Sequence, residues 1–319
     1  MPRRSLFASL LFVLSLGAVA DGPAGLKVAI QPKAIAPHTF FVQGLPGVAS
    51  AENQGFNSNA AFVVTDEGVV VVDVLGSPVL GKALLAAIRH VTDKPVKRVI
   101  ITHYHADHFY GLQAFKDAGA EIWAHRAAQE YLDGGEGARR LAQRAQDLFP
   151  WVEPDMKLVR ADRWLDGDTS FTLGGMRFDI AYMGPAHSPE DLIVSVPTEG
   201  VVFSGDILYG GRIPFVGEAD SKRWLATTEK LLALHPKVLV PGHGAVSRDP
   251  AKDLTLTREY ITYLREAMGK AVEDFTPFDE AYASTDWRRF EKVPAFDAAN
   301  RVNAYGQYLV MERELLQKK

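Results

Sequence analysis

One short segment after a predicted buried strand carries four side chains of the kinds that bind metal ions. The strand, Val96–Thr102, consists mainly of apolar and β-branched residues, and it leads directly into His-Tyr-His-Ala-Asp-His. His103 and His105 are two residues apart, so an extended backbone directs both imidazoles to the same side. Asp107 and His108 fall at the start of the next predicted helix, where they can turn toward a second ion. The sequence therefore predicts a metal site at the end of this strand.

The absence of cysteine restricts the chemistry of such a site. The chain has 319 residues and no cysteine, which excludes thiolate zinc sites, iron–sulfur clusters, disulfide scaffolds and cysteine nucleophiles. Neutral imidazole and carboxylate ligands suit Zn²⁺, with iron and manganese as alternatives. The formal net charge of −4 gives no reason to expect nucleic-acid binding, which normally requires a basic surface. A small-molecule substrate is therefore the expected partner.

The first twenty residues have the pattern of a secretory signal peptide. Arg3 and Arg4 give a positive start, residues 6–19 are almost entirely apolar, and Ala18-Val19-Ala20 matches the small-x-small cleavage pattern. The apolar run is shorter than the ~20 residues that cross a bilayer comfortably, and no positive stop-transfer cluster follows it. We therefore expect cleavage of residues 1–20, no stable membrane insertion afterwards, and a periplasmic or secreted protein.

Strand-like and helix-like segments alternate along most of the chain, which indicates a layered α/β domain. We assign residues 21–248 to this domain and residues 249–319 to a helical C-terminal extension, because two amphipathic helices are expected there, Lys252–Asp274 and Ala298–Gln317. The strands expected in the first domain are Thr39–Val42, Ala60–Thr65, Val69–Val74, Val96–Thr102, Glu121–Ala124, Arg177–Tyr182, Asp191–Val196, Val201–Ser204 and Lys237–Val240, and the helices are Lys82–His90, Phe109–Ala118 and most of 126–149.

Three further candidate ligands follow predicted strands, in loops that contain glycine or proline. His187 lies in Gly-Pro-Ala-His-Ser, Asp206 in Ser-Gly-Asp-Ile and His243 in Pro-Gly-His-Gly. Loops at strand ends bring side chains to one edge of a sheet, and glycine lets the backbone come close to an ion. Each residue alone is an ordinary loop residue, but their order after the first motif indicates one shared site.

The ordered set of Thr-His-x-His-x-Asp-His, a later His, Ser-Gly-Asp and Pro-Gly-His-Gly resembles the motifs of the metallo-β-lactamase superfamily over about residues 38–246. The resemblance implies a four-layer αβ/βα sandwich with a metal site at the upper edge of its two sheets. It also implies a ligand set in which His103, His105 and His187 bind one ion, Asp107, His108 and His243 bind a second, and Asp206 bridges the two.

Other positions refine this resemblance. Asp73, after a run of four valines, matches the family's first motif and is expected to orient a ligand. Asp206 stands where many zinc β-lactamases have Cys or Ser, and it is similar to the ligand set of glyoxalase II-like dinuclear hydrolases. Residues 53–62 and 206–212 resemble an exported subgroup described as quinoprotein relay system, or sulfur-oxidation-associated, zinc metallohydrolases.

The resemblance suggests a mechanism with two Zn²⁺ ions about 3.5–4 Å apart, bridged by Asp206 and by a hydroxide that attacks an electrophilic carbonyl. Asp107 is the candidate catalytic residue, because it can also orient or accept a proton. The expected substrate is a small ester, thioester, lactone or amide. Tyr104, Tyr209 and Arg212 are close to ligands in sequence and are expected to line the substrate pocket. Arg212 has two interpretations, pairing with a substrate carboxylate or forming a structural salt bridge.

Three other functions stay open at this point. A β-lactam-hydrolysing enzyme fits the expected location, but Asp206 argues against it. A mononuclear iron persulfide dioxygenase uses the same fold with fewer metal ligands. A non-catalytic periplasmic protein could handle a metal or cofactor for a quinoprotein system. The remaining histidines match no superfamily ligand and are expected to have structural or solvated roles: His38, His90, His125 and His235.

Overall fold

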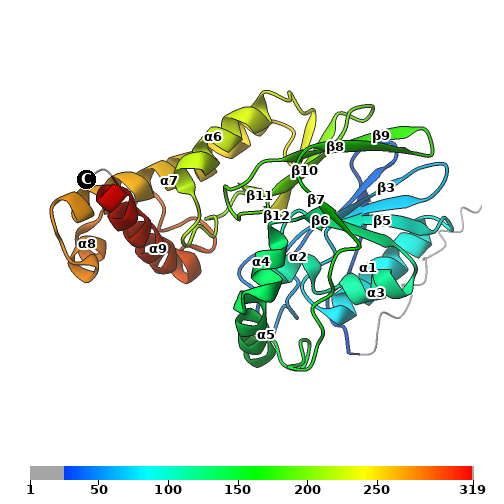
Figure 1. The fold of residues 1–319 in the computed structure, drawn as a ribbon, viewed down its shortest axis with the longest axis horizontal. Coiled ribbons are helices and arrows are strands. Elements are labelled where there is room, and N and C mark those ends of the chain that lie inside the picture. Colours follow the sequence, from blue (N-terminus) through cyan, green and yellow to red (C-terminus); the bar gives the residue numbers. More distant parts are fainter. Residues whose placement is uncertain (1–24, 318–319) are drawn as a thin grey trace, which may run out of the picture.

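The first of two facing sheets has seven strands in the order β1-β2-β3-β4-β5-β6-β7 (Figure 1). The computed structural model describes residues 25–317, so the predicted signal peptide lies outside the described residues. Neighbouring strands are antiparallel from β1 to β4 and parallel from β4 to β7. The strands are β1 (Lys33–Ala34), β2 (Thr39–Val42), β3 (Ala60–Val64), β4 (Val69–Val72), β5 (Val96–Ile100), β6 (Glu121–His125) and β7 (Arg163–Leu165).

The second sheet has five strands in the order β12-β11-β10-β9-β8, and only its β11–β12 pair is parallel. β1, β7 and β8 are absent from the predicted strands. No residue of β8 is fully buried, so β8 lacks the apolar run that reveals a strand in the sequence. The strands of this sheet are β8 (Thr169–Leu173), β9 (Met176–Tyr182), β10 (Leu192–Val196), β11 (Val201–Gly210) and β12 (Val238–Gly244).

Helices cover the outer face of each sheet. The predicted helix Phe109–Ala118 is two helices, α2 and α3, and the Gly111 between them packs so closely against Gly81 of α1 that a side chain on Gly111 would collide with it. Helices α6 and α8 were not expected. The helices are α1 (Pro78–Val91), α2 (Ala106–Phe109), α3 (Leu112–Asp117), α4 (Ala128–Asp133), α5 (Glu136–Asp147), α6 (Ser221–Leu232), α7 (Pro250–Glu273), α8 (Phe278–Ser284) and α9 (Phe296–Gln317).

The valines of β4 show how the sequence builds the layers. Successive side chains of a strand point to opposite faces, so Val70 and Val72 pack between the two sheets while Val69 and Val71 pack under α1 and α3. A third apolar core lies between the second sheet and helices α6, α7 and α9. The order of layers is therefore helix, sheet, sheet, helix, which confirms the predicted α/β sandwich.

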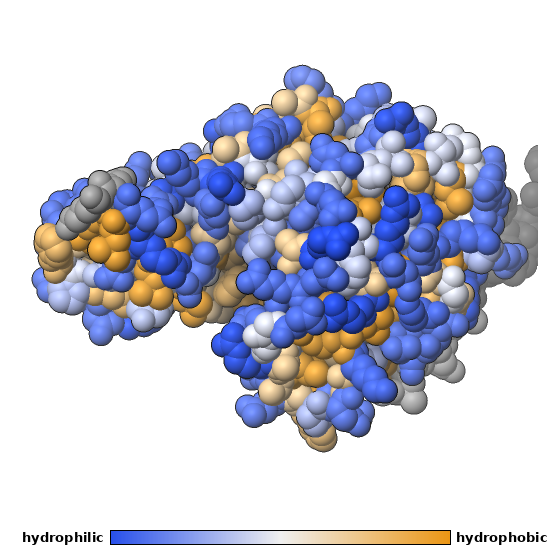
Figure 2. Space-filling view, viewed as in Figure 1, coloured by the Kyte–Doolittle hydropathy of each residue, from blue (hydrophilic) through white to orange (hydrophobic). Residues whose placement is uncertain are grey.

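The C-terminal extension is helical, as predicted, and leads away from the sandwich along α7, against which α8 and α9 pack (Figure 1). Two buried amides of α9 bind the segment before α6: the Oδ1 atom of Asn303 accepts hydrogen bonds from the backbone N–H groups of Val216 and Gly217, and Gln307 donates to the carbonyl of Gly217. Figure 2 shows apolar surface on these C-terminal helices. Within residues 25–317, no helix is both long and apolar enough to span a membrane.

Candidate metal centre

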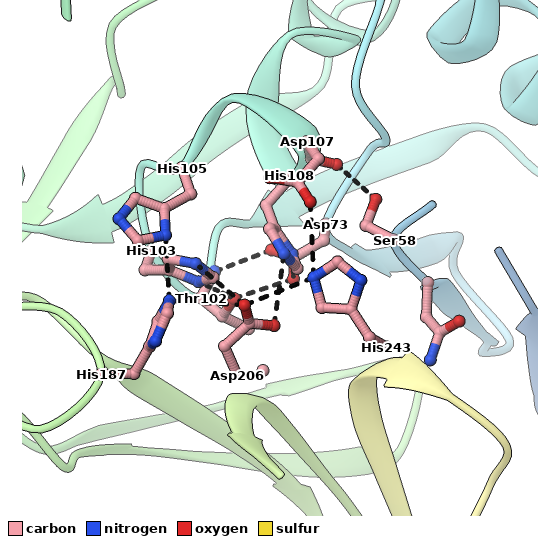
Figure 3. Close-up of polar contacts among 12 residues, drawn as sticks. Ser58, Asp73, Thr102, His103, His105, Asp107, His108, His187, Asp206 and His243 are labelled. Carbon is pink, nitrogen blue, oxygen red and sulfur yellow. Dashed lines mark hydrogen bonds and ion pairs between the residues drawn. The ribbon is translucent and has the colours of Figure 1, made fainter. Parts of the chain in front are cut away.

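The predicted ligands converge at one edge of the two sheets (Figure 3). His103 and His105 follow β5, while Asp107 and His108 lie in the short helix α2. His187 lies in the loop between β9 and β10. The parallel strands β4, β5 and β6 end near one another, which brings these side chains to the sheet edge that the sequence predicts.

Asp206 and His243 lie within strands, whereas the sequence predicts loops after shorter strands. β11 and β12 continue through both residues, but the register of their pairing shifts between Phe203 and Gly205 and again between Gly205 and Tyr209. Gly205 has a φ of 51°, a backbone conformation that favours glycine. The irregular pairing around it interrupts the strand, and Asp206 points toward the histidines (Figure 3).

A first cluster contains His103, His105, His187 and Asp206, whose potential ligand atoms all lie within 4.8 Å of one another. The Nε2 atom of His187 is 2.9 Å from Nδ1 of His105 and 3.4 Å from Oδ2 of Asp206. The Nε2 atom of His103 is 3.8 Å from the same carboxylate oxygen. Three imidazoles and one carboxylate at these distances match the donors that Zn²⁺ prefers.

A second cluster contains Asp107, His108 and His243, again with all ligand atoms within 4.8 Å of one another. The Nε2 atom of His243 is 3.4 Å from Oδ2 of Asp107 and 3.4 Å from Oδ2 of Asp206. The Nε2 atom of His108 is 3.3 Å from Oδ1 of Asp206. The carboxylate of Asp206 thus lies between both clusters, which is the position expected of a bridging ligand.

The buried carboxylate of Asp73 orients two of these histidines, as the sequence predicts. His108 donates its Nδ1–H to Oδ2 of Asp73 over 2.9 Å, and the hydroxyl of Thr102 donates to the same oxygen over 2.8 Å. The Thr102 oxygen in turn lies 3.1 Å from Nδ1 of His103, so it can accept that N–H. With Nδ1 engaged, the Nε2 lone pair of each imidazole is available to a metal ion.

Replacing Asp73 with alanine is expected to weaken zinc binding by about 10- to 100-fold, because His108 and Thr102 lose their common acceptor. The buried backbone N–H of Thr102, which donates to Oδ1 of Asp73 over 2.8 Å, also loses its partner. Each unpaired buried donor costs about 1–3 kcal/mol of stability. Competition against a chromophoric zinc chelator measures the affinity, and urea unfolding measures the stability. Unchanged zinc affinity in Asp73→Ala would show that this network does not orient the ligands.

The donor atoms of the centre fit a divalent ion. Among the residues that the structure describes, Nε2 of His103, Nε2 of His108 and Oδ1 of Asp206 are buried atoms without a hydrogen-bond partner. Buried polar groups are normally hydrogen-bonded, and each of these atoms lies within one of the two clusters. Metal coordination would satisfy all of them.

Burial and nearby charges shift the pKa values of the imidazoles and carboxylates of the centre in different directions. Burial lowers the pKa of His105 to about 3 and the pKa of His187 to about 4. Burial opposes ionisation of Asp206, but His243 and His108 outweigh it and lower the pKa of this carboxyl. Burial likewise disfavours the His108 cation, yet Asp206 and Asp73 raise its pKa. A metal ion that binds Nε2 of His108 therefore has to displace a proton, so zinc uptake should weaken with falling pH.

Three residues before β3 support the second cluster and were not assigned a role from the sequence. Asn57 donates to Oδ2 of Asp107 over 3.0 Å, and its carbonyl accepts the Nδ1–H of His243 over 2.8 Å. The hydroxyl of Ser58 donates to the carbonyl of Asp107. Asn59 donates to the carbonyls of residues 241 and 244, on both sides of His243. The feature of the sequence that could have indicated this role is the polar run Asn57-Ser58-Asn59 directly before a buried strand.

The three residues expected to line the substrate pocket differ in their positions. Tyr104 does not line it: the side chain is 0% exposed, packs against Phe109 and Trp164, and donates its hydroxyl to the backbone carbonyl of residue 159. The alternation of side chains that directs His103 and His105 toward the metal clusters turns Tyr104 into the core. Tyr209 and Arg212 do line a cavity of about 330 Å³ beside the clusters.

Tyr209 contacts residues of the two clusters, whereas Arg212 contacts a loop beside them. The Tyr209 ring stacks on His243 with centroids 5.0 Å apart, and its hydroxyl donates to Oδ2 of Asp206. Arg212 donates to the carbonyl of Gly47 over 2.6 Å and forms no ion pair among the described residues. The four histidines without an expected ligand role lie outside both clusters; His125, for example, stacks on Tyr182 with centroids 4.0 Å apart.

The buried Asp191, four residues after His187, predicts a pH dependence of stability. Ser188 donates its N–H and hydroxyl to this carboxyl, but burial raises the pKa of Asp191 to about 8. The folded state therefore binds more protons than the unfolded state between pH 4 and 8, so stability falls as pH rises through this range, by up to about 1.4 kcal/mol per pH unit.

We expect the free energy of unfolding of the wild type, compared with that of Asp191→Asn, to decrease steadily from pH 5 to pH 8. Asparagine has nearly the same shape and does not titrate, so the difference between the two proteins isolates this carboxyl. Urea unfolding at fixed zinc concentration measures it at each pH. Parallel pH profiles for the two proteins would contradict the expectation.

A family profile and several characterised proteins are similar to this chain. The sequence profile described as the Metallo-beta-lactamase superfamily matches residues 53–243. The chain is 25% identical over 240 residues to a linear primary-alkylsulfatase from Pseudomonas sp., covering 64% of this chain and 45% of that protein. It is 27% identical over 220 residues to a type 2 metallo-beta-lactamase from Elizabethkingia meningoseptica, covering 67% of this chain and 78% of that protein.

Solved structures share the fold. An inverting sec-alkylsulfatase from Pseudomonas sp. superposes with a TM-score of 0.67 at 17% identity, covering 88% of this chain and 50% of that one. A metallo-beta-lactamase from Pontibacter korlensis superposes with a TM-score of 0.57 at 20% identity, covering 73% of this chain and 98% of that one. The chain thus spans about half the length of the alkylsulfatases that it matches. The family profile matches more than half of the residues of this chain, and solved members of the family share its two-sheet fold. This chain therefore belongs to the metallo-beta-lactamase superfamily.

Proposed function

We propose that this protein is a dinuclear zinc-dependent hydrolase that acts on a small ester, thioester, lactone or amide. The observation that carries the proposal is the pair of His/Asp clusters with the Asp206 carboxylate between them. The relatives are named for the hydrolysis of alkyl sulfates and of β-lactams, which supports hydrolysis as the reaction type.

The residues of the two clusters are the proposed ligands of the two ions. His103, His105 and His187 would hold one zinc ion, and Asp107, His108 and His243 the other, with Asp206 between them. Two such ions would lower the pKa of a water molecule and polarise the bond that is cleaved.

Asp107 is our candidate for moving a proton. Its carboxylate lies beside the cavity, and Asn57 fixes it by donating to Oδ2. Burial opposes its ionisation, but the charges of His108, His243 and Arg144 lower the pKa of Asp107, so it is a carboxylate at neutral pH and can accept a hydrogen bond from a water molecule in the cavity. Tyr209, by donating to Asp206, fixes the orientation of the carboxylate that the two clusters share.

The finer assignments are parts of the same proposal. The Asp at position 206 supports a glyoxalase II-like ligand set over a dedicated β-lactamase, and residues 53–62 and 206–212 support the quinoprotein relay system or sulfur-oxidation-associated subgroup. The pattern of residues 1–20 supports export to a periplasm or secretion. Seven donors in two clusters support two ions over the single iron of a persulfide dioxygenase.

A substrate panel on metal-verified protein tests the proposal. We expect the zinc-loaded chain to hydrolyse nitrophenyl esters, thioesters or lactones, to lose this activity with a chelator, and to regain it with Zn²⁺. Turnover of nitrocefin at rates comparable with those of esters would instead support a β-lactamase. One iron per chain with oxygen consumption on a persulfide would support a dioxygenase. Retained zinc with no activity on the whole panel would support a metal- or cofactor-handling protein.

A further inference from the structure

The cavity beside the metal clusters has two walls of different chemistry. Its volume of about 330 Å³ suits a small molecule, and it opens directly onto His105, Asp107, Asp206 and His243. One wall is the polar face of α5. The other carries apolar side chains from residues 48–49, from Phe215 and from the start of α9, together with Arg212. Figure 2 shows the recess between the C-terminal helices and the part of the sandwich that carries α5.

Two arginines of α5 face this cavity without a carboxylate partner. Arg140 and Arg144 are four residues apart, which places them on one face of the helix, and both are partly buried. Arg140 donates a hydrogen bond to the side-chain oxygen of Gln143 over 3.3 Å, and neither guanidinium forms an ion pair with any described residue. The adjacent Arg139, by contrast, points to another face of the helix and pairs with Glu136.

No described carboxylate forms an ion pair with either arginine, although the charge of Arg144 acts on Asp107 and three glutamates line a second cavity together with Arg140. Asp147 also lines the cavity but forms no ion pair with either guanidinium. Asp107 and Asp206, the other acids of the cavity, lie within the two metal clusters and are engaged there. Two unpaired guanidiniums beside a cavity are suited to bind an oxyanion, because their planar N–H groups match the geometry of a carboxylate or a sulfonate.

Apart from Arg212, which donates to the carbonyl of Gly47, the opposite wall is apolar, and part of it is held by the C-terminal extension. Phe215, Ala298 and Ala299 contribute to it. The two backbone N–H groups that follow Phe215 donate to Asn303 of α9, over 2.8 and 3.1 Å. The position of Phe215 at the cavity therefore depends on α9, and the extension contributes to the shape of the site.

We infer that Arg140 and Arg144 bind an anionic group of the substrate that is remote from the cleaved bond, while the apolar part of the same substrate packs against Phe215 and Ala298. The substrate is then an amphiphilic anion with a hydrolysable bond held over Asp107 and Asp206. This inference rests on the proposed hydrolase function and narrows its substrate class.

A matched pair of esters tests the inference: 4-nitrophenyl butyrate, which is neutral, and the mono-4-nitrophenyl ester of glutaric acid, which carries a carboxylate at the far end of its acyl chain. In the zinc-loaded double variant R140Q/R144Q, we expect the ratio of KM for the anionic ester to KM for the neutral ester to rise by about 10- to 100-fold. R139Q, on another face of the same helix, should leave this ratio at its wild-type value. An unchanged ratio in the double variant would overturn the inference.

A binding measurement separates failure of the inference from failure of the hydrolase function. Calorimetry with hexanoate and with hexanesulfonate, which are not hydrolysed, should show affinity in wild type and R139Q that is lost in R140Q/R144Q. A larger loss for one of the two anions identifies the preferred headgroup. If no ester is hydrolysed but this loss occurs, the hydrolase proposal fails and the anion site stands. If esters are hydrolysed but neither anion distinguishes the variants, only the anion site fails.

Discussion

Replacing Asp206 with alanine is expected to reduce hydrolysis by about a thousandfold or more. Its carboxylate lies 3.4 Å from Nε2 of His187 in one cluster and 3.3 Å from Nε2 of His108 in the other. Removing it takes one donor from both clusters at once. It also leaves the hydroxyl of Tyr209 without its acceptor.

Steady-state kinetics on the best ester of the panel, with metal content measured on the same samples, checks this expectation. His90→Ala is the matched control, because His90 is an exposed histidine of α1 whose Nδ1 contacts only the carbonyl of residue 86. We expect His90→Ala to keep both zinc and activity. Near-normal activity in Asp206→Ala would mean that the shared carboxylate is not needed for the reaction.

Replacing Gly242 with alanine is expected to lower activity by about 100-fold, although the new methyl group is small. A Cβ atom at residue 242 would collide with Oδ1 of Asp206 and would lie 2.9 Å from the backbone carbon of Gly205. The carboxylate has to move away, and displacement of a catalytic group by about 1 Å can cost roughly 100-fold in rate. The main effect should be on zinc affinity and kcat, since Gly242 lies in β12 within the centre.

The control for Gly242→Ala is Gly167→Ala. Gly167 has no atom within 4 Å of the position that a Cβ would take, and its backbone is outside the left-handed region. The two variants therefore make the same chemical change with and without a collision. Zinc titration, kcat and thermal unfolding of both proteins are compared with the wild type. Equal behaviour of the two variants would show that close approach of the backbone to Asp206 is not required.

The residues of the two clusters could be predicted because strand geometry and the ordered motifs both point to them. His103 and His105 alternate with Tyr104 along extended backbone, and the structure places both histidines in the first cluster. The same alternation should have excluded Tyr104 from the pocket, since a residue between two ligands points the other way. The role of Asp73 was expected from its match to the first motif of the resembled family, and the structure shows its carboxylate in contact with His108 and Thr102.

Features that depend on contacts between distant segments could not be predicted in the same way. The extension of β11 to Gly210 requires pairing with β12, which lies about thirty residues later in the chain. Asn57 contacts Asp107 and His243, fifty or more residues away, and its polar run before a buried strand does not reveal which residues it contacts. The sequence of β8 has no buried apolar pattern, because its side chains are partly or fully exposed. Its assignment as a strand depends on pairing with β9.

The composition of the cavity is a further property that emerges only in three dimensions. Arg140 and Arg144 look like ordinary surface residues of an amphipathic helix, and Phe215 and Ala298 lie more than eighty residues apart in the chain. The fold brings the two arginines to one wall of the cavity beside the metal clusters, and Phe215 and Ala298 to the opposite wall. We therefore expect substrate selectivity to depend on the helical parts of the chain as well as on the motif residues.

The zinc content of the purified chain tests the central claim most directly. After dialysis against dilute Zn²⁺ and removal of loosely bound ions, elemental analysis of the wild type should give two zinc ions per chain, because two clusters of donors share Asp206. The same measurement on Asp206→Ala should give markedly less. A wild-type content well below one ion per chain in a protein that still hydrolyses esters would contradict a dinuclear zinc centre.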